Sequence, residues 1–446
     1  MSKQKIQLSD HFTYPRLLRF VLPAVGTMLF TSIYGIVDGL CVSNFVGKTA
    51  FAAVNLIMPL PQLLATIGFM LGTGGSAIVG ITLGEGDQKK ADRYFTLFLL
   101  AALVSVSVLA VLGIVFLRPI AVLLGAKGEL LDYAVRYGRI LMVSLPTFAL
   151  QNMFQSFFVT AEKPHLGFWF TVGAGCTNMV LDVLMVGIWG WGVEGAAIAT
   201  FISQLVGGVL PVFYFIDRSN SSRLHLCKTS FYSKVLRDAC INGSSELMTN
   251  LSMSLVNILY NYQLLRLAGE NGVAAYGVIM YAAFLFVAVF VGYAVGSAPI
   301  VSFHYGARNH AEVHNLYRKS LRLIAVVAVT LTLASMFIIP CVARIFVGYD
   351  AELLALTSRA FRLYALSFLI MGFNVYASSF FTALGDGVTS ALISFLRTLA
   401  FQVIAILLLP LLLGIDGIWL AVTAAELAAL AVSAAMLLTK DKVFHY

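Results

Sequence analysis

The chain has 446 residues, of which 60% are hydrophobic and only 11% are charged. A soluble protein of this size carries roughly a quarter of its residues as charged side chains, so this composition excludes a water-soluble globular domain. The net charge of +8 does not indicate a nucleic-acid partner, because the basic residues lie in short loops between apolar segments, where they orient a membrane protein.

The apolar segments are about 20 residues long or longer and lack a ten-residue alternation, which predicts transmembrane helices rather than a β-barrel. In chain order we expect spans at 17–46, 50–83, 92–117, 136–160, 165–188, 195–216, 236–267, 273–304, 314–347, 357–383, 388–413 and 417–439. The sequence therefore predicts an all-α membrane protein of about twelve helices. The first apolar segment lacks a small-residue cleavage pattern, so we interpret it as a retained helix.

The first span contains Asp38 well inside its apolar run, where a carboxylate is costly unless it is protonated, paired or hydrated. One interpretation is a structural hydrogen bond to a neighbouring helix, and the other is a site that titrates or binds a cation. Gly35 and Gly39 flank Asp38 as a G-x-x-x-G pair, which allows close approach of another helix backbone. Because burial disfavours the charged carboxylate, we expect Asp38 to take up and release a proton.

The fifth span presents Asn178 and Asp182 at a spacing of four residues, which places both side chains on one helix face. An amide and a carboxylate presented together can hold a proton or coordinate sodium through their oxygens. The alternative is that Asp182 lies near the membrane surface and is simply hydrated. If Asp38 shares a pocket with this pair, the titrations of the two carboxylates are coupled.

Residues 217–234 form a charged, serine-rich linker near the middle of the chain. It predicts an N-half (1–216, six spans), a cytoplasmic linker (217–234) and a C-half (235–446, six spans). With the first residues inside, about 19 Lys and Arg fall on the inner side and about 9 on the outer side. This bias predicts that both termini and the linker are cytoplasmic.

The two halves share four short motifs in the same order, at an offset of about 222 residues. The matched pairs are 47–53 with 269–275, 86–92 with 306–312, 156–158 with 379–381, and 192–195 with 414–417. Because each half has an even number of spans, both have the same orientation, which predicts two six-helix lobes related by a pseudo-twofold axis along the membrane normal. The substrate path is then expected between the lobes, near the midplane.

The C-half has fewer candidate site residues. Glu246, about ten residues into the seventh span, is a second protonation site, a contact for a cationic substrate, or a structural hydrogen-bonding group. Glu426 in the twelfth span and Arg397 in the eleventh are interpreted as packing, snorkelling or gating groups.

The chain contains no nucleotide-binding loop, metal-ligand spacing or catalytic set. We therefore expect neither an enzyme nor an ATP-driven pump, and no cofactor. The expected energy source is a proton or sodium gradient, and any sodium would bind at Asp38, Asn178 and Asp182.

The segments 34–39 (YGIVDG) and 44–47 (NFVG), the fifth-span N-x-x-x-D and the segment 192–200 (GVEGAAIAT) resemble the multidrug and toxic compound extrusion (MATE) transporters over nearly the whole chain. The resemblance implies two six-helix lobes in a V shape and export of amphipathic, often cationic compounds in exchange for protons or sodium. It implies that Asp38, Asn178 and Asp182 form the N-lobe cation site of the DinF-like and MepA-like branch. Tyr34 corresponds to the aromatic residue at the start of the first-span motif.

The sequence departs from the family at Gly35, where an asparagine is usual, and in the tenth span (361–382), which has no carboxylate. Glu246 and Tyr34 are therefore the candidates for a second coupling or substrate site. We expect a multi-pass monomer in the cytoplasmic membrane of a bacterium, acting on small amphipathic molecules. The alternative is a flippase for a lipid or lipid-linked oligosaccharide, which should gather basic residues to hold phosphates, whereas the interior charge of the N-half is acidic.

Overall fold

The computed structural model describes residues 6–348, 350–444 and 446. Within them the chain is helical and contains no strand. The N-half comprises α1 (Tyr14–Phe45), α2 (Lys48–Ile57), α3 (Pro59–Gly84), α4 (Gln88–Leu123), α5 (Gly128–Thr160), α6 (Pro164–Leu181), the π-helix η1 (Asp182–Ile188), α7 (Gly192–Gly208) and α8 (Leu210–Ile216). This all-helical architecture was predicted.

The C-half comprises α9 (Ser233–Asn242), α10 (Ser244–Gly306), α11 (His310–Val347), α12 (Ala351–Ala365), α13 (Phe368–Ala383), α14 (Gly387–Phe395), the π-helix η2 (Leu396–Ala400), α15 (Phe401–Leu413) and α16 (Ile415–Phe444). The 63-residue α10 is two helices joined at Gly269, whose φ of 62° lies in the region that only glycine adopts readily. The chain reverses there, so α10 contributes two spans.

The number of spans agrees with the prediction of about twelve. In the described residues, nine helices are long and apolar enough to cross a membrane, and the bent pair α12–α13 makes ten. Counting both arms of α10 and including the 33-residue α5 gives twelve. Two interruptions, neither of them at a proline, were not predicted: α12 and α13 meet at 46°, and Gly243 separates α9 from α10 within the seventh span.

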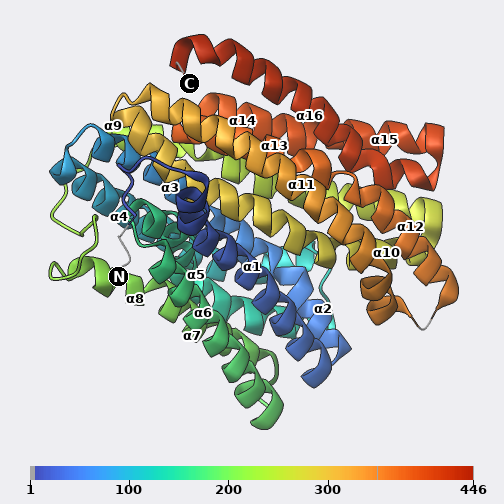
Figure 1. Ribbon diagram of the computed structural model, residues 1–446. Helices are drawn as coiled ribbons and strands as arrows, with labels where there is room; N and C mark the ends of the chain where they lie inside the picture. Colours follow the sequence, from blue (N-terminus) through green and yellow to red (C-terminus); the bar gives the residue numbers. More distant parts are fainter. Residues whose placement is uncertain (1–5, 349, 445) are drawn as a thin grey trace.

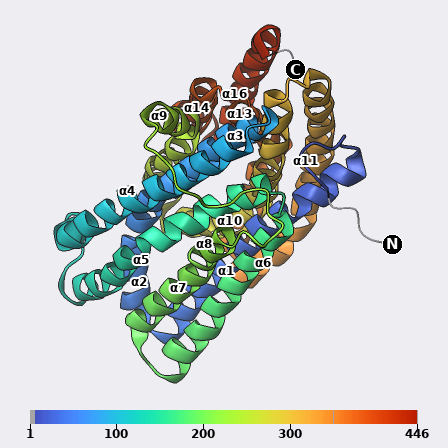
Figure 2. The ribbon, with the colours of Figure 1, turned by 90° about the vertical axis from the view of Figure 1, so that its left-hand side faces the viewer.

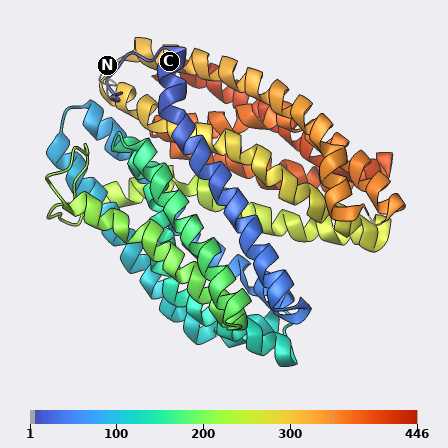
Figure 3. The same cartoon turned by 60° about the horizontal axis from the view of Figure 1, so that its bottom comes forward.

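The helices form two groups that correspond to the two halves (Figure 1). The loop at 217–232, α9 and both termini lie at one end of the molecule, which we call the linker end. The two groups lie together there and spread apart toward the other end, which we call the far end (Figure 3). At the linker end α9 lies between α3 of the N-half and α14 of the C-half (Figure 2).

Glycines allow the two halves to approach closely at the linker end. A Cβ atom added to Gly84 of α3 would overlap the backbone at Phe303, and one added to Gly306 of α10 would overlap the backbone at Ile81. Gly243 makes a third contact of this kind with the backbone of α3. Backbones this close exclude side chains from the interface, which is the packing that small residues permit between membrane helices.

Residues 6–13, which we call the strap, cross from one half to the other at the linker end. The Leu8 N–H donates to Glu162 of the N-half (2.9 Å), and the Phe12 N–H donates to Glu312 of α11 in the C-half (2.9 Å). His11 Nδ1 lies 2.6 Å from the same Glu312 carboxylate, and Lys319 donates to the Phe12 carbonyl (2.6 Å). Leu8 and Phe12 are fully buried, so the strap is part of the interface between the halves.

Candidate functional site

Asp38 and Asp182 face each other inside the N-half. Asp38 lies on α1 and is 8% exposed, while Asp182 is the first residue of η1 and is fully buried. Their carboxyl groups lie close enough to repel each other when both are charged. The burial of Asp182 excludes the interpretation that this residue is hydrated at the membrane surface. The charged neighbour of Asp38 is therefore another acid.

Asp182 lies where the helix changes type. Its backbone N–H bonds to the carbonyls of both Asn178 and Met179, where the helix changes from α6 to the π-helix η1. Single π-turns inside membrane and soluble helices occur frequently at functional sites. The four-residue spacing predicted a common face for Asn178 and Asp182, but it did not predict this change of helix type.

Asn178 brings amide atoms to the same region. Its side chain is 2% exposed, and neither its oxygen nor its nitrogen has a hydrogen-bond partner among the described residues. Both carboxylate oxygens of Asp182 and Oδ1 of Asp38 also lack a hydrogen-bond partner among the described residues. Buried polar groups without partners are costly. Oxygens grouped in this way suit a proton or a hard cation such as sodium.

Two further residues of this region, on α5, were missed by sequence reasoning. Tyr137 is fully buried and interacts electrostatically with both Asp38 and Asp182. Gln151 is 5% exposed and lies near Tyr34, which itself interacts electrostatically with Asp38. The only signal in the sequence for Gln151 was a glutamine inside an apolar span. The sequence does not show which face of the helix this residue occupies.

The close approach of another helix that the glycine pair would allow is not present at Gly35. A Cβ atom added to Gly35 would meet nothing within 4 Å, so no other backbone approaches this glycine in the structure. Its partner in the G-x-x-x-G pair, Gly39, lies outside the residues whose surroundings are described, as does Asn44. The close backbone contacts lie instead on α3 and α10, where Gly72 packs on the backbone of Met153.

The C-half contains a buried ion pair between Arg397 of η2 and Glu426 of α16. Arg397 Nη1 lies 3.2 Å from Glu426 Oε1, and the two side chains are 12% and 1% exposed. Asn374 of α13 donates to Glu426 Oε2 (2.7 Å) and accepts a bond from Ser433 (2.9 Å). Snorkelling, one of the interpretations made from the sequence, is excluded because the guanidinium is held inside the protein.

Glu246 lies in the first turn of α10, three residues after the glycine contact between the halves at Gly243. It is half-buried, and its side chain makes no hydrogen bond or ion pair with other described residues. It interacts electrostatically with Arg397. Glu246 therefore lies in the C-half, on a helix that packs against η2, the π-helix of Arg397.

The described residues contain no group of three or more His, Cys, Asp and Glu side chains that could hold a metal ion. A sodium ion at Asp38 and Asp182 would therefore take its remaining ligands from amide, hydroxyl or water oxygens. Sodium binding there stays a prediction.

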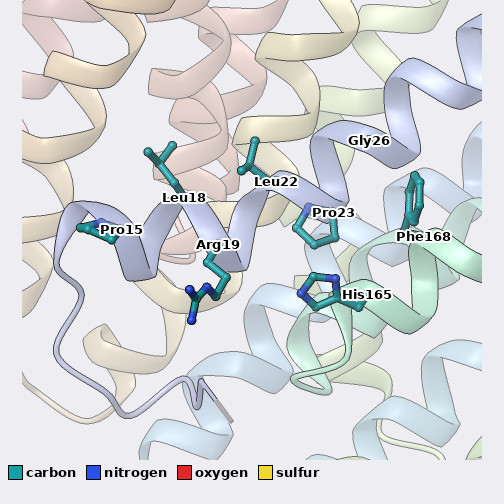
Figure 4. Close-up of a pocket in the computed structure, with 8 residues that line it drawn as sticks. All are labelled: Pro15, Leu18, Arg19, Leu22, Pro23, Gly26, His165 and Phe168. Atoms are coloured by element: carbon teal, nitrogen blue, oxygen red, sulfur yellow. The ribbon is translucent and has the colours of Figure 1, made fainter. Parts of the chain in front are cut away.

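The surface also has a groove of about 470 Å³ between α1 and α6. Its lining includes Arg19, Pro23, His165 and Phe168 (Figure 4). It includes none of the buried carboxylates, so it is separate from the candidate site. Pro23 interrupts the hydrogen bonding of α1 at this level, which permits a bend in the helix that carries Asp38.

Comparison with known proteins gives a consistent result. The family profile described as MatE matches residues 23–184 and 247–408, one match in each half. The multidrug export protein MepA of Staphylococcus saprophyticus is 21% identical over 433 residues, covering 96% of this chain and 94% of that protein. The MepA protein of Staphylococcus aureus is 21% identical over 432 residues, covering 96% and 95%.

Two solved structures have the same fold. A crystal structure of MATE in complex with MaL6 superimposes with a TM-score of 0.93 at 22% identity, covering all of both chains. The outward-facing conformation of a multidrug resistance MATE family transporter of the MOP superfamily also gives 0.93 at 22% identity, covering 100% of this chain and 99% of that one. These likenesses and the doubled profile match confirm the predicted arrangement of two similar halves.

Proposed function

Since the chain belongs to the MatE family, in its MepA-like branch, we propose that it is a secondary-active antiporter that exports amphipathic, cationic compounds in exchange for protons or sodium. The observation that carries this proposal is the pair of facing carboxylates, Asp38 and Asp182, inside the N-half. The names of the relatives support a small-molecule substrate of the drug type. No cofactor is required, because the ion gradient supplies the energy.

The carboxylate pair supports ion coupling by simple electrostatics. Two buried acids that lie close together cannot both be ionised without a compensating charge. The N-half therefore holds a proton or a sodium ion in its stable state. When the site opens to the opposite side of the membrane, it loses this ion. The two carboxylates then repel each other again, which favours movement of α1 relative to η1.

One inward proton provides enough energy for substantial accumulation. A membrane potential of 100 mV contributes roughly 2.3 kcal/mol per charge, and a pH difference of one unit adds about 1.4 kcal/mol. Since each 1.4 kcal/mol is a tenfold factor, a one-to-one exchange supports a substrate gradient of a few hundredfold, neglecting the charge of the substrate.

The remaining features follow from this proposal. The division into an N-half (1–216), a linker (217–234) and a C-half (235–446) puts the substrate path between the halves. The protein then lies in the cytoplasmic membrane as a multi-pass monomer, with both termini and the linker in the cytoplasm. A lipid or oligosaccharide flippase is disfavoured, because the buried Arg397 is already neutralised by Glu426 and is not available for a phosphate.

Asp38→Asn tests the proposal, because the amide imitates the protonated acid and cannot release a proton. The variant should fold, and in proteoliposomes it should lose uphill export of a fluorescent organic cation under an imposed proton or sodium gradient. Imposing each gradient separately identifies the coupling ion. Uphill export by Asp38→Asn at the wild-type rate would show that Asp38 is structural. Coupling would then have to be sought at Asp182 or Glu246.

A further inference from the structure

The groove of about 470 Å³ between α1 and α6 uses one face of α1. Residues spaced three and four apart lie on the same side of a helix, and the lining residues of α1 have this spacing: Pro15, Leu18, Arg19, Leu22, Pro23 and Gly26. The opposite face of α1 packs on the C-half, where Val21 and Ala24 lie against Gly296. The groove is therefore turned away from the interface between the halves.

Both walls of the groove are basic near the linker end and apolar further along. α1 begins directly after the strap, and α6 begins just after Glu162, which bonds to the strap, so both helices start at the linker end. Along these helices Arg19 precedes Gly26, and His165 precedes Phe168. Figure 4 shows the side chains of Arg19 and His165 on the same side of α1. The apolar part is closely packed, since a Cβ atom added to Gly26 would lie 3.0 Å from the ring of Phe168.

The two basic side chains of the groove have no partner in the described part of the chain. Arg19 and His165 are exposed and make no hydrogen bond or ion pair with another described residue. None of the described residues that line the groove is acidic. The guanidinium offers several N–H donors, and the imidazole offers at least one in either charge state. The groove therefore suits an anion that accepts hydrogen bonds.

Two exposed tryptophans of the fifth span show how deep the groove lies in the membrane. Trp169 is 64% exposed, and Trp189, at the other end of the span, is 52% exposed. At a rise of about 1.5 Å per residue, their separation corresponds to about 30 Å, the thickness of the hydrocarbon core. Tryptophan is enriched at both edges of a membrane, and the exposed Val180 and Val183 lie between these two. Trp169 thus marks the membrane edge at the linker end, and His165, one helical turn before it, lies at the level of the lipid headgroups.

We propose that the groove binds a phospholipid of net negative charge from the leaflet at the linker end. Its phosphate accepts hydrogen bonds from Arg19 and His165. One acyl chain lies along Leu22, Gly26 and Phe168. The lining residues thus follow the order of the lipid, with donors at the headgroup level and apolar surface toward the membrane interior. A zwitterionic lipid brings a second cation close to Arg19, so charge complementarity favours the anionic lipid.

This inference goes beyond the proposed export and does not rest on it. All described lining residues belong to the N-half, so the lipid lies outside the expected path between the halves and is not a substrate in transit. The groove also contains Pro23, where α1 lacks a backbone hydrogen bond. The lipid is therefore a bound component of the membrane that contacts α1 where this helix can bend.

The test compares two substitutions of the same kind on α1. Arg19→Gln removes the guanidinium from the groove. Arg16→Gln is the matched control, because Arg16 does not line the groove and donates to the His11 carbonyl instead (3.3 Å). His165→Phe replaces the second donor by an apolar ring. The three substituted positions are exposed, where a change of side chain usually has little effect on stability, and thermal unfolding in detergent checks that each variant is folded.

The measurement is native mass spectrometry of the full-length protein in detergent, titrated with phosphatidylglycerol or with phosphatidylcholine of the same acyl chains. The wild type and Arg16→Gln should prefer phosphatidylglycerol. Arg19→Gln should reduce this preference roughly fivefold, the loss expected for one basic group at a lipid surface. The double variant Arg19→Gln/His165→Phe should reduce it further. Inorganic phosphate in excess should not displace the lipid, because it lacks an acyl chain.

The remaining outcomes contradict the proposal. Equal affinity of the wild type for the two lipids would show that the groove does not select an anionic headgroup. A loss of preference as large in Arg16→Gln as in Arg19→Gln would show that the lipid responds only to overall charge. An unchanged preference in the double variant would place the lipid elsewhere, and displacement by inorganic phosphate would indicate a site for a free anion. Asp38→Asn, which tests the proposed export, lies outside the groove and should keep the wild-type preference.

Discussion

Buried acids in this protein fall into two classes that a single sequence does not distinguish. Asp182 and Glu426 both lie inside apolar spans and are both almost completely enclosed. Asp182 faces another acid, whereas Glu426 is bonded to a guanidinium and an amide. The first arrangement is electrostatically strained when the acids are charged, and the second is satisfied.

Alanine at these positions should therefore have opposite effects on stability. Asp182→Ala removes repulsion and should not lower the unfolding temperature, although it should abolish ion-driven export, and Asn178→Ala should weaken export in the same way. Glu426→Ala leaves the charge of Arg397 unpaired and should cost about 3–5 kcal/mol. Thermal unfolding in detergent checks the predicted stabilities, and transport assays in proteoliposomes check the predicted losses of export. Normal gradient-driven transport by the two fifth-span variants would place the ion site elsewhere.

Sequence reasoning identified the ionisable members of the N-half site because any acid inside an apolar span is conspicuous. It missed Tyr137 and Gln151, because the face that a residue of α5 presents is decided by packing against other helices. It also missed the pairing of Arg397 with Glu426, which lie on different helices and come together only in the folded C-half.

At the level of helices, spans were predictable and their ends and bends were not. Length and hydropathy decide where a membrane helix forms, and the predicted spans match the helices closely. The break at Gly243 depends on the contact of this glycine with the backbone of α3, which is far away in sequence. Helix ends depend on caps such as Asp386, which accepts bonds from the Thr389 N–H (3.2 Å) and hydroxyl (2.7 Å) at the start of α14.

Asp386 also pairs with Lys440 of α16 (2.9 Å), in the loop outside the spans. Burial acts to raise the pKa of this carboxyl group, but the bonds from Lys440 and Thr389 outweigh it and hold the pKa below its usual range. A lowered pKa means that the stabilisation is complete above about pH 4, the ordinary value for aspartate, and is lost as the pH falls through the lowered pKa.

Asp386→Ala should accordingly lower the stability by about 1 kcal/mol at neutral pH, the usual cost of losing a helix cap. The difference in unfolding temperature from the wild type should persist down to about pH 4 and shrink below it. Asp386→Asn keeps a capping oxygen without the charge, so its difference from the wild type isolates the ion pair. A difference that is constant from pH 7 to pH 3 would contradict the role of the carboxylate.

At the level of the whole molecule, the strap, the loop at 217–232 and the C-terminal end of α16 lie at one end (Figure 1). The excess of basic residues in these segments predicts that this end faces the cytoplasm. The spreading of the helix groups toward the far end then corresponds to an outward-facing arrangement.

Labelling of the loop tests this orientation. Ser221→Cys, in a background without the five native cysteines, introduces a thiol at an exposed position of the loop. An impermeant thiol reagent should not label it in intact cells and should label it after permeabilisation. Equal labelling of intact cells would reverse the orientation, and the direction of export with it.

The strap has a consequence for how the protein is made. Phe12 is bonded to Glu312, which the ribosome adds 300 residues later. At a synthesis rate of about 5–20 residues per second, the strap waits roughly 15–60 seconds for this partner. During that time eight spans are inserted, and α11, which carries Glu312, is not yet there to pack against the buried side chain of Phe12. Closure of the linker end is therefore a late step in biogenesis, and an unfinished chain leaves an apolar segment exposed to chaperones and proteases.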